Sequence, residues 1–118
     1  MLFRSRSFLF IDECLEGTIR LMRSNQTGPF NIGSEEMVTI NQLVDVVSGI
    51  AGKKLKKRHI PGPTGVRGRN SDNRLIKERL DWAPSQPLAK GLQRTYEWIS
   101  GQVMALSNRQ KEIGRAHV

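Results

Sequence analysis

The sequence predicts an α/β fold with about three short strands and four helices. Short apolar runs alternate with longer segments whose apolar residues recur at helical spacing, and glycine and proline residues separate them. With 118 residues, 37% of them hydrophobic and 25% charged, the composition is typical of one globular domain and excludes a disordered or collagen-like chain. Three short strands make too small a sheet to bury four amphipathic helices, so we expect the chain to be part of a larger unit.

The first half of the chain predicts two pairs of a strand followed by a helix. Residues 7–11 form an apolar run bounded by charge, which is typical of a buried strand, and a helix is predicted over 12–24 with Asp12 as its N-cap. Residues 30–33 predict a second, very short strand that ends at a glycine. Thr39 lies three residues before Gln42, the spacing of a capping box, so a second helix is predicted to begin there and to end at Gly52.

The second half predicts one strand and two helices. Residues 54–60 are typical of a lysine-rich edge strand, which the Pro61-Gly62-Pro63 breaker stops. After a glycine-rich loop, Asp72 is expected to cap a third helix that ends before Pro84. Pro87 is expected to begin the fourth helix, whose residues on one stripe are Leu88, Leu92, Thr95, Ile99, Val103 and Leu106.

The composition also predicts where the protein resides. The longest apolar run near the N-terminus, residues 8–11, is too short for a bilayer span or a signal segment, so neither a membrane location nor export is expected. Cys14 is the single cysteine, which excludes an internal disulfide and a site built from several thiolates. We therefore expect a cytoplasmic protein.

The formal net charge of +8 is concentrated in one stretch of the sequence. Residues 53–79 hold ten basic and two acidic residues, which accounts for the whole net charge, so an anionic ligand is expected there. One alternative is that an edge strand and a solvated helix face are simply neighbours in sequence. Another is a small basic nucleic-acid-binding module formed by residues 53–79. The stretch contains no Phe, Tyr or Trp to stack on bases, which argues against that module.

Most catalytic motifs are missing from the sequence. The glycine spacing at positions 62, 65 and 68 does not lead directly into a helix, as a dinucleotide-binding loop would. Tyr96 has no lysine four residues later, and no catalytic, cofactor-binding or metal site is expected in this chain. The candidate that remains is the run from Arg67 to Asp72, whose arginines could bind phosphate with help from the following helix N-terminus. Alternatively, Asp72 only caps that helix and the arginines pair with surface acids.

Four stretches together resemble the C-terminal part of the NAD-dependent sugar-nucleotide epimerases and dehydratases, the extended short-chain dehydrogenase family. They are residues 6–12 (RSFLFID), 31–38 (NIGSEEMV), 65–73 (GVRGRNSDN) and 80–84 (LDWAP). The arginine stretch is similar in particular to the branch of the family that epimerises GDP-mannose at carbons 3 and 5. The family usually has glycine where this chain has Asp81, and glutamine where it has Arg4.

The resemblance implies the C-terminal part of an extended Rossmann-type epimerase, namely the substrate-binding domain plus a late Rossmann strand. It further implies that Arg6 and Arg69 bind a sugar nucleotide of the GDP-mannose type, with Arg69 on the diphosphate and with Arg67 and Asn70 as neighbours. The family's NAD-binding loop and its Tyr-x-x-x-Lys pair would lie upstream, so this chain is expected to be inactive alone. Members of the family are commonly homodimers, so the resemblance implies a homodimer for the full-length protein, and neither a membrane nor nucleic acid is an expected partner.

The resemblance also divides the chain into three parts. Residues 6–106 would be the substrate-binding portion, and residues 1–5 are a start of doubtful origin. Residues 107–118 are expected to be a non-native or disordered tail, and residues 112–118 have no apolar period. Within that tail, residues 112–118 read as the in-frame translation of a common sequencing-library adapter.

Overall fold

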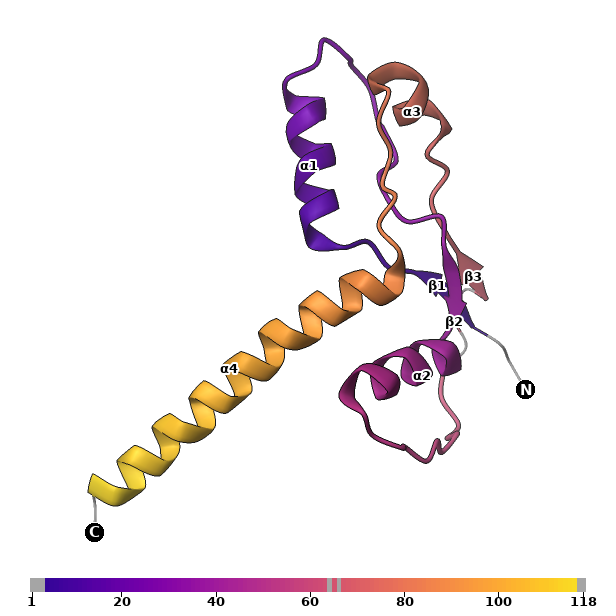
Figure 1. The fold of residues 1–118 in the computed structure, drawn as a ribbon. Helices are drawn as coiled ribbons and strands as arrows, with labels where there is room; N and C mark the ends of the chain where they lie inside the picture. Colours follow the sequence, from indigo (N-terminus) through magenta and orange to yellow (C-terminus); the bar gives the residue numbers. More distant parts are fainter. Residues whose placement is uncertain (1–3, 64, 66, 117–118) are drawn as a thin grey trace.

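The computed structural model describes residues 4–63, 65 and 67–116, and within this part it contains four helices and a three-stranded mixed sheet (Figure 1). In chain order the elements are β1 (Ser5–Ser7), α1 (Ile11–Met22), β2 (Met37–Thr39), α2 (Ile40–Ala51), β3 (Gly68–Arg69), α3 (Arg74–Leu80) and α4 (Leu88–Ala116). The predicted α/β class is confirmed, and so are the numbers of strands and helices.

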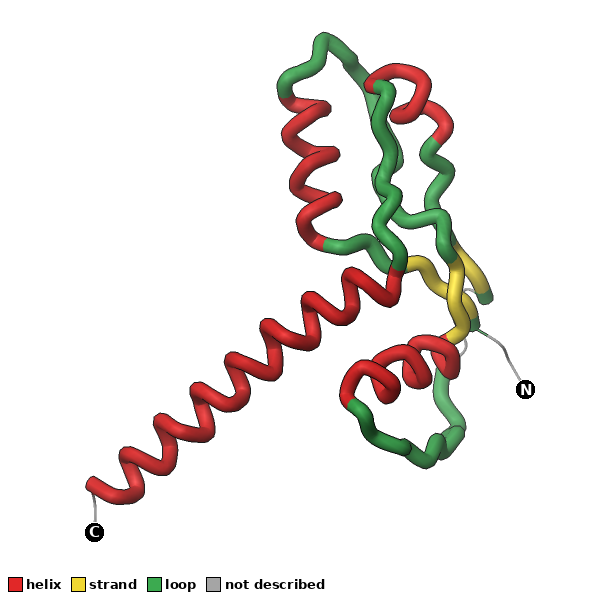
Figure 2. Tube along the Cα trace, viewed as in Figure 1, coloured by secondary structure: helices red, strands yellow, loops and turns green. Residues whose placement is uncertain are grey.

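The sheet is short and has β1 at its centre, in the order β2-β1-β3. β1 pairs antiparallel with β2, where Arg6 lies opposite Val38, and parallel with β3, where Arg6 lies opposite Arg69. A parallel pair needs a long crossover connection, and here the chain between β1 and β3 supplies it. Figure 2 shows the three strands meeting in the middle of the molecule, between the upper and lower groups of helices.

The molecule is elongated rather than compact. Helices α1 and α3 lie on one side of the sheet, and α2 and the loop after it lie on the other (Figure 1). α4 packs against α2, and its C-terminal part extends away from the rest of the molecule. The radius of gyration is 19.1 Å, whereas a compact chain of this length has a value of about 13.5 Å. The sheet therefore joins two small groups of elements without gathering them around one core.

Few apolar side chains are buried. Ile76 of α3 is fully buried and Leu88 at the start of α4 is nearly so. Gly17 is buried under the ring of Trp82, because a Cβ at this glycine would lie 2.8 Å from that ring. In contrast, large apolar residues of α1 are exposed, with Leu15 at 53% and Met22 at 79%. These exposed faces confirm the expectation that so small a sheet cannot bury the helices.

The second helix follows its local signals closely. The hydroxyl of Thr39 accepts a hydrogen bond from the backbone N–H of Gln42 at 3.1 Å, and the Gln42 side chain accepts one from the N–H of Thr39 at 2.8 Å. Gly52 ends the helix in the left-handed conformation with φ of 67°. The predicted capping box and glycine C-cap of α2 are both confirmed.

The predicted positions of the strands are wrong. The first strand is Ser5–Ser7 instead of 7–11, and residues 30–33 and 54–60 form no strand. Segment 30–33 lies against the loop before α3, where the carbonyl of Gly33 accepts a side-chain hydrogen bond. The other segment folds back onto α2, because Lys57 pairs with Asp45 at 2.6 Å. The strands observed instead, β2 and β3, are two or three residues long and have no apolar run of their own.

Two predicted helix caps are also wrong. α1 begins one residue earlier than expected, with Phe10 at the N-cap position and no side-chain cap, so Asp12 lies in the first turn, where it pairs with Arg94 at 3.4 Å. α3 has Asn73 at its N-cap position, again without a side-chain cap. Asp72 lies one residue further out and forms a local turn with Arg74.

The last helix is longer than the apolar stripe from which it is predicted, which ends at Leu106. α4 continues to Ala116, so residues 107–116 are helical and the expectation of a disordered tail is wrong for them. Their native or non-native origin stays a prediction. Residues 1–3 of the doubtful start and residues 117–118 of the tail lie outside the described residues. No helix in the described part of the chain has both the length and the apolarity needed to cross a bilayer.

Candidate functional site

The sheet brings Arg6 and Arg69 together. They are register partners on the neighbouring parallel strands β1 and β3, although 63 positions separate them in the sequence. Partners in a parallel pair project from the same face of the sheet, and neighbouring strands lie about 4.8 Å apart. The two residues that the resemblance implies for binding a sugar nucleotide are therefore adjacent on one face.

Two further arginines lie next to this pair. Arg4 stands directly before β1 and Arg67 directly before β3, each two residues from Arg6 or Arg69. The backbone N–H of Ser5 donates to the carbonyl of Arg67 at 2.8 Å, which continues the β1–β3 pairing back to that arginine. We call Arg4, Arg6, Arg67 and Arg69 the arginine face. Arg4 was not among the predicted site residues, although its spacing of two from Arg6 on a strand is a signal that could have identified it.

The arginine face lacks compensating acidic groups. The Arg6 guanidinium donates to the carbonyl of Ser5 at 2.8 Å, and that of Arg4 donates to the carbonyl of Pro63. Arg67 and Arg69 are exposed. Within the described residues, none of these four arginines forms an ion pair with a carboxylate, which argues against the alternative that they pair with surface acids. Like charges on adjacent strands destabilise a sheet, so this arrangement favours an anionic ligand.

The opposite face of the sheet is uncharged at this point. Met37 on β2 shares a face with Ser7 and reaches across β1 to Gly68 on β3. A Cβ at Gly68 would lie 2.9 Å from the terminal carbon of Met37, so only glycine leaves this side chain in place without a shift. Arg6 and Arg69 therefore lie on one face of the sheet, and Met37 lies on the other.

A set of hydrogen bonds fixes the chain directly after Arg69. Residues 70–73 contact residues 33–35, and we call this contact the loop clamp. The Asn70 side chain donates to the carbonyl of Glu35 at 3.5 Å, and the N–H of Ser71 donates to the carbonyl of Ser34 at 3.3 Å. The Asn73 side chain donates to the carbonyl of Gly33 at 2.7 Å. The predicted ligand residue Asn70 thus turns its amide group toward Glu35.

The N-terminus of α3 does not add to an anion site. The helix has seven residues, and acidic side chains already accept hydrogen bonds from two N–H groups at its start. The N–H of Asn73 donates to the Glu35 carboxylate at 3.3 Å, and that of Arg74 donates to Asp72 at 3.1 Å. These two N–H groups already have carboxylate partners, which argues against the expectation that this helix N-terminus assists phosphate binding.

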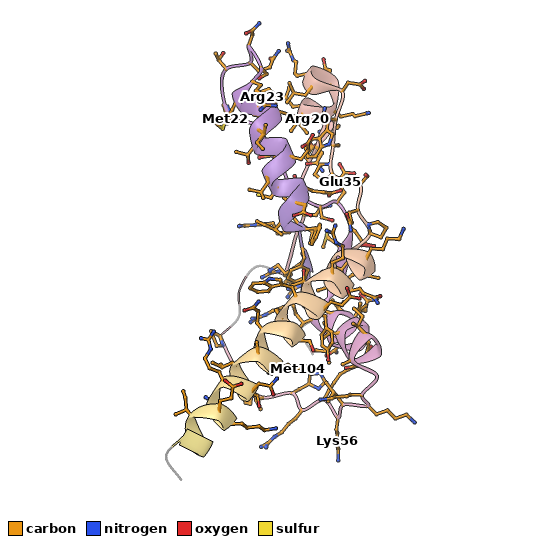
Figure 3. All side chains as sticks on the ribbon, turned by 60° about the vertical axis from the view of Figure 1, so that its left-hand side comes forward. Arg20, Met22, Arg23, Glu35, Lys56 and Met104 are labelled. Carbon is orange, nitrogen blue, oxygen red and sulfur yellow. The ribbon has the colours of Figure 1, made fainter. Side chains whose placement is uncertain are left out.

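The basic stretch of the sequence is not one patch in space. The lysines of residues 53–57 lie in the loop after α2, the arginine face lies on the sheet, and residues 74–79 lie in α3 at the far side of the sheet (Figure 1). Figure 3 shows Lys56 projecting from one end of the molecule and Arg20 and Arg23 at the other end. The anion is thus expected at the arginine face and not along the whole stretch.

The described residues contain neither a dinucleotide loop nor a metal cluster. Gly65 and Gly68 lie in the loop before β3 and in β3 itself, and no helix follows them directly. Across the described part of the chain, no three side chains of His, Cys, Asp or Glu are placed to hold a metal ion.

Comparisons with known proteins agree with this geometry, although no family model matches the chain. GDP-mannose 3,5-epimerase of Arabidopsis thaliana is 56% identical over 100 residues, which are 85% of this chain and 26% of that protein. The fold is similar to that of UDP-glucose 4-epimerase from Thermotoga maritima with UDP-glucose, with a TM-score of 0.79 and 28% identity over 85% of this chain and 33% of the other. UDP-glucuronic acid 4-epimerase from Bacillus cereus in complex with NAD gives a TM-score of 0.71 and 26% identity, over 83% and 32% of the two chains.

These matches cover more than four fifths of this chain but only part of each relative. The chain spans about a quarter of the length of the curated relatives it matches and about a third of the solved structures. The matched part is the C-terminal part of those proteins. By sequence and by fold, the chain belongs to the NAD-dependent sugar-nucleotide epimerases and dehydratases and corresponds to their C-terminal part.

Proposed function

We propose that this chain is the substrate-binding portion of a GDP-mannose 3,5-epimerase and that its arginine face binds the diphosphate of the sugar nucleotide. The observation that carries the proposal is the register pairing of Arg6 with Arg69 on one face of the sheet. Guanidinium groups present paired N–H donors that match phosphate oxygens, and they keep their charge at all physiological pH values. GDP-mannose is the proposed substrate because of the 56% identity to an epimerase of that name.

The proposed role of these residues is to bind and orient, and not to transfer protons. NAD is the proposed cofactor and would supply the oxidation and re-reduction of the sugar, held by a part of the protein that this chain does not include. The chain's residues would fix the diphosphate, which places the sugar at a defined distance from that part. Binding energy from a remote, non-reacting group of a substrate can be used in this way to position the reacting group.

Two broader proposals concern the complete protein: the first rests on the resemblance to the family, and the second on the composition of this chain. The complete protein would be a homodimer, which light scattering after size-exclusion chromatography would test. It would reside in the cytoplasm, which agrees with the single, unpaired Cys14. Imaging of the complete protein fused to a fluorescent protein would test the location.

A chimeric enzyme tests the proposed function. Residues 4–106 of this chain would replace the matching segment of the Arabidopsis epimerase, and turnover of GDP-mannose would be measured. We expect an active chimera in which Arg69→Ala raises KM by roughly 10- to 100-fold, because a charged hydrogen bond contributes about 1.5–3 kcal/mol. The matched control is Arg20→Ala, since Arg20 is an exposed arginine of α1 that pairs with Glu16 and lies outside the arginine face.

The same experiment separates the proposal from its alternative. If the chimera has no activity, or if Arg69→Ala and Arg20→Ala behave alike, the substrate-binding proposal is wrong. A nucleic-acid-binding module would instead show affinity for DNA or RNA that falls steeply when salt is raised from about 50 to about 200 mM. The relatives named above are all sugar-nucleotide enzymes, so they give no support to that alternative.

A further inference from the structure

Asn73 is a buried polar residue whose side chain is not needed for the start of α3. It is 3% exposed, and although it stands at the N-cap position, its side chain makes no capping hydrogen bond. The side-chain nitrogen donates to the carbonyl of Gly33 at 2.7 Å, and the side-chain oxygen accepts from the hydroxyl of Ser71, also at 2.7 Å. Its backbone N–H donates to the Glu35 carboxylate at 3.3 Å. The amide group therefore joins two loops that are distant in sequence.

The two loops approach closely where Asn73 joins them. A Cβ at Gly33 would lie 2.7 Å from the Cβ of Ser71, a distance that real Cβ atoms do not adopt. The loop clamp therefore depends on a glycine on one side and on a buried asparagine on the other. A buried amide group without hydrogen-bond partners destabilises the folded state by about 1–3 kcal/mol. Burial of the Asn73 side chain is therefore favourable only while the Gly33 carbonyl and the Ser71 hydroxyl remain its partners.

The loop clamp lies directly beside Arg69. Before this residue the backbone is held by the pairing of β3 with β1, and after it by the hydrogen bonds of residues 70–73. β3 itself has only two residues, so strand pairing alone fixes the backbone weakly at this point. The strand pairing and the loop clamp together therefore fix the backbone of Arg69, and with it the positions that its guanidinium can occupy.

We propose that Asn73 is a positioning residue for sugar-nucleotide binding: it holds residues 70–73 on residues 33–35 and thereby sets the position of Arg69 on the arginine face. This inference rests on the proposed function of that face. Asn73 touches no substrate in this role. A misplacement of about 1 Å at a binding group can change a rate by a factor of about 100, so a small shift of the loop is enough to weaken binding.

Two substitutions disturb the loop clamp from its opposite sides. Asn73→Asp keeps the size of the side chain and the acceptor for Ser71, but replaces the donor to Gly33 with an oxygen that cannot donate when ionised. Gly33→Ala introduces a methyl group where Ser71 lies. The matched control is Asn41→Asp, the same chemical change at an asparagine of α2 that contacts His59 at 3.2 Å and has no part in the clamp.

The first measurement uses the chimeric enzyme described above. We expect Asn73→Asp and Gly33→Ala to raise KM for GDP-mannose by about 10-fold or more while kcat stays within about 2-fold, and Asn41→Asp to change neither. A purely structural role would lower the thermal stability of both variants and leave KM unchanged in the molecules that remain folded. That second outcome would overturn the proposal.

The second measurement needs no catalysis and uses the 118-residue chain itself. Hydrogen exchange would follow the amide of Ser71, which donates to Ser34, and the amide of Ser5, which donates to Arg67. In Asn73→Asp both amides should exchange at least about 10-fold faster, while the amide of Gln42 in α2 should not change. If Ser71 alone responds, Arg69 is not positioned by the clamp and the inference is wrong. If Arg69→Ala does not change the KM of the chimera for GDP-mannose, the proposed function is wrong. The exchange data would still decide whether Asn73 holds the loop in place.

Discussion

At the scale of single residues, Asp81 shows how the structure explains a departure from the family pattern. The family usually has glycine at this position, and here Asp81 adopts a φ of 50° at the end of α3. This left-handed conformation is unfavourable for residues with a Cβ, although aspartate tolerates it better than most. The turn before Trp82 therefore requires a positive φ at this position, which glycine adopts without steric cost.

This backbone requirement leads to a stability prediction. Asp81→Gly should stabilise the chain by about 0.5–1 kcal/mol, because glycine adopts positive φ without steric cost. The lost contact between Asp81 and Lys77 is exposed and contributes little. Urea unfolding followed by circular dichroism measures the change, with Asp81→Asn as a control that should be nearly neutral. A loss of stability in the glycine variant would contradict the argument.

The ionisation of Asp72 is a second property of a single residue. The Arg74 side chain donates hydrogen bonds to its carboxylate, at 2.7 Å from Nη2 and at 3.0 Å from Nε, and this lowers the pKa of Asp72 from 3.8 to about 2. Because the pKa is lower in the folded chain than in the unfolded one, the ionised group favours folding above about pH 3.9. That contribution is lost as the pH falls toward 2.

Carbon-13 chemical shifts of the carboxyl groups measure this titration directly. The midpoint for Asp72 is expected near pH 2. Arg74→Gln should raise it, because the guanidinium is lost, but only part of the way toward the ordinary value, because the backbone N–H of residue 74 still donates to the carboxylate. The change in stability should be small, since both side chains are largely in water. An unchanged midpoint in Arg74→Gln would show that the pair does not persist in solution.

At the scale of elements, the capping box of α2 should contribute measurably to stability. Thr39→Ala removes the hydroxyl that accepts from the N–H of Gln42, and we expect a loss of about 1 kcal/mol. Thr18→Ala is the matched control, because the Thr18 hydroxyl donates to the carbonyl of Cys14 within α1 and caps no helix end. Equal effects of the two substitutions in urea unfolding would show that the box does not stabilise the helix.

The same comparison of elements explains what sequence reasoning could and could not predict. α2 was predictable because its start and its end depend on residues within the helix and next to it, namely Thr39, Gln42 and Gly52. β2 and β3 were not, because strands of two or three residues are defined by partners far away in the sequence. Local patterns carry no information about such pairing. The strand predicted from the apolar run at 7–11 therefore does not coincide with the observed strand at Ser5–Ser7.

In the candidate site, too, some features could be predicted from the sequence and others could not. The resemblance identified Arg6, Arg67, Arg69 and Asn70 by type and neighbourhood, and the sheet register then placed Arg6 beside Arg69. The loop clamp was beyond prediction, since it consists of hydrogen bonds across 35 to 40 positions in the sequence. Asp72 was predicted as a cap from its residue type alone, but the chain places Asn73 at that position.

At the scale of the whole molecule, apolar residues of similar size differ widely in how far they are buried. The stripe on α1 consists of exposed side chains, with Ile11 at 59%, Leu15 at 53% and Ile19 at 43%. Ile76 in α3 is 0% exposed. In this elongated molecule, with a radius of gyration of 19.1 Å, the α1 stripe is only partly covered by the other described residues.

Alanine substitutions at two of these positions should therefore differ in their effect on the 118-residue chain. Ile76→Ala should lower the free energy of unfolding by about 2–5 kcal/mol, because it leaves a cavity in the small core. Leu15→Ala should change it by less than about 0.5 kcal/mol, since the side chain is already half in water and alanine favours helix formation. Urea unfolding at several protein concentrations measures both. A loss at Leu15 that equals the loss at Ile76 and grows with concentration would instead show that copies of the chain cover the α1 stripe by associating.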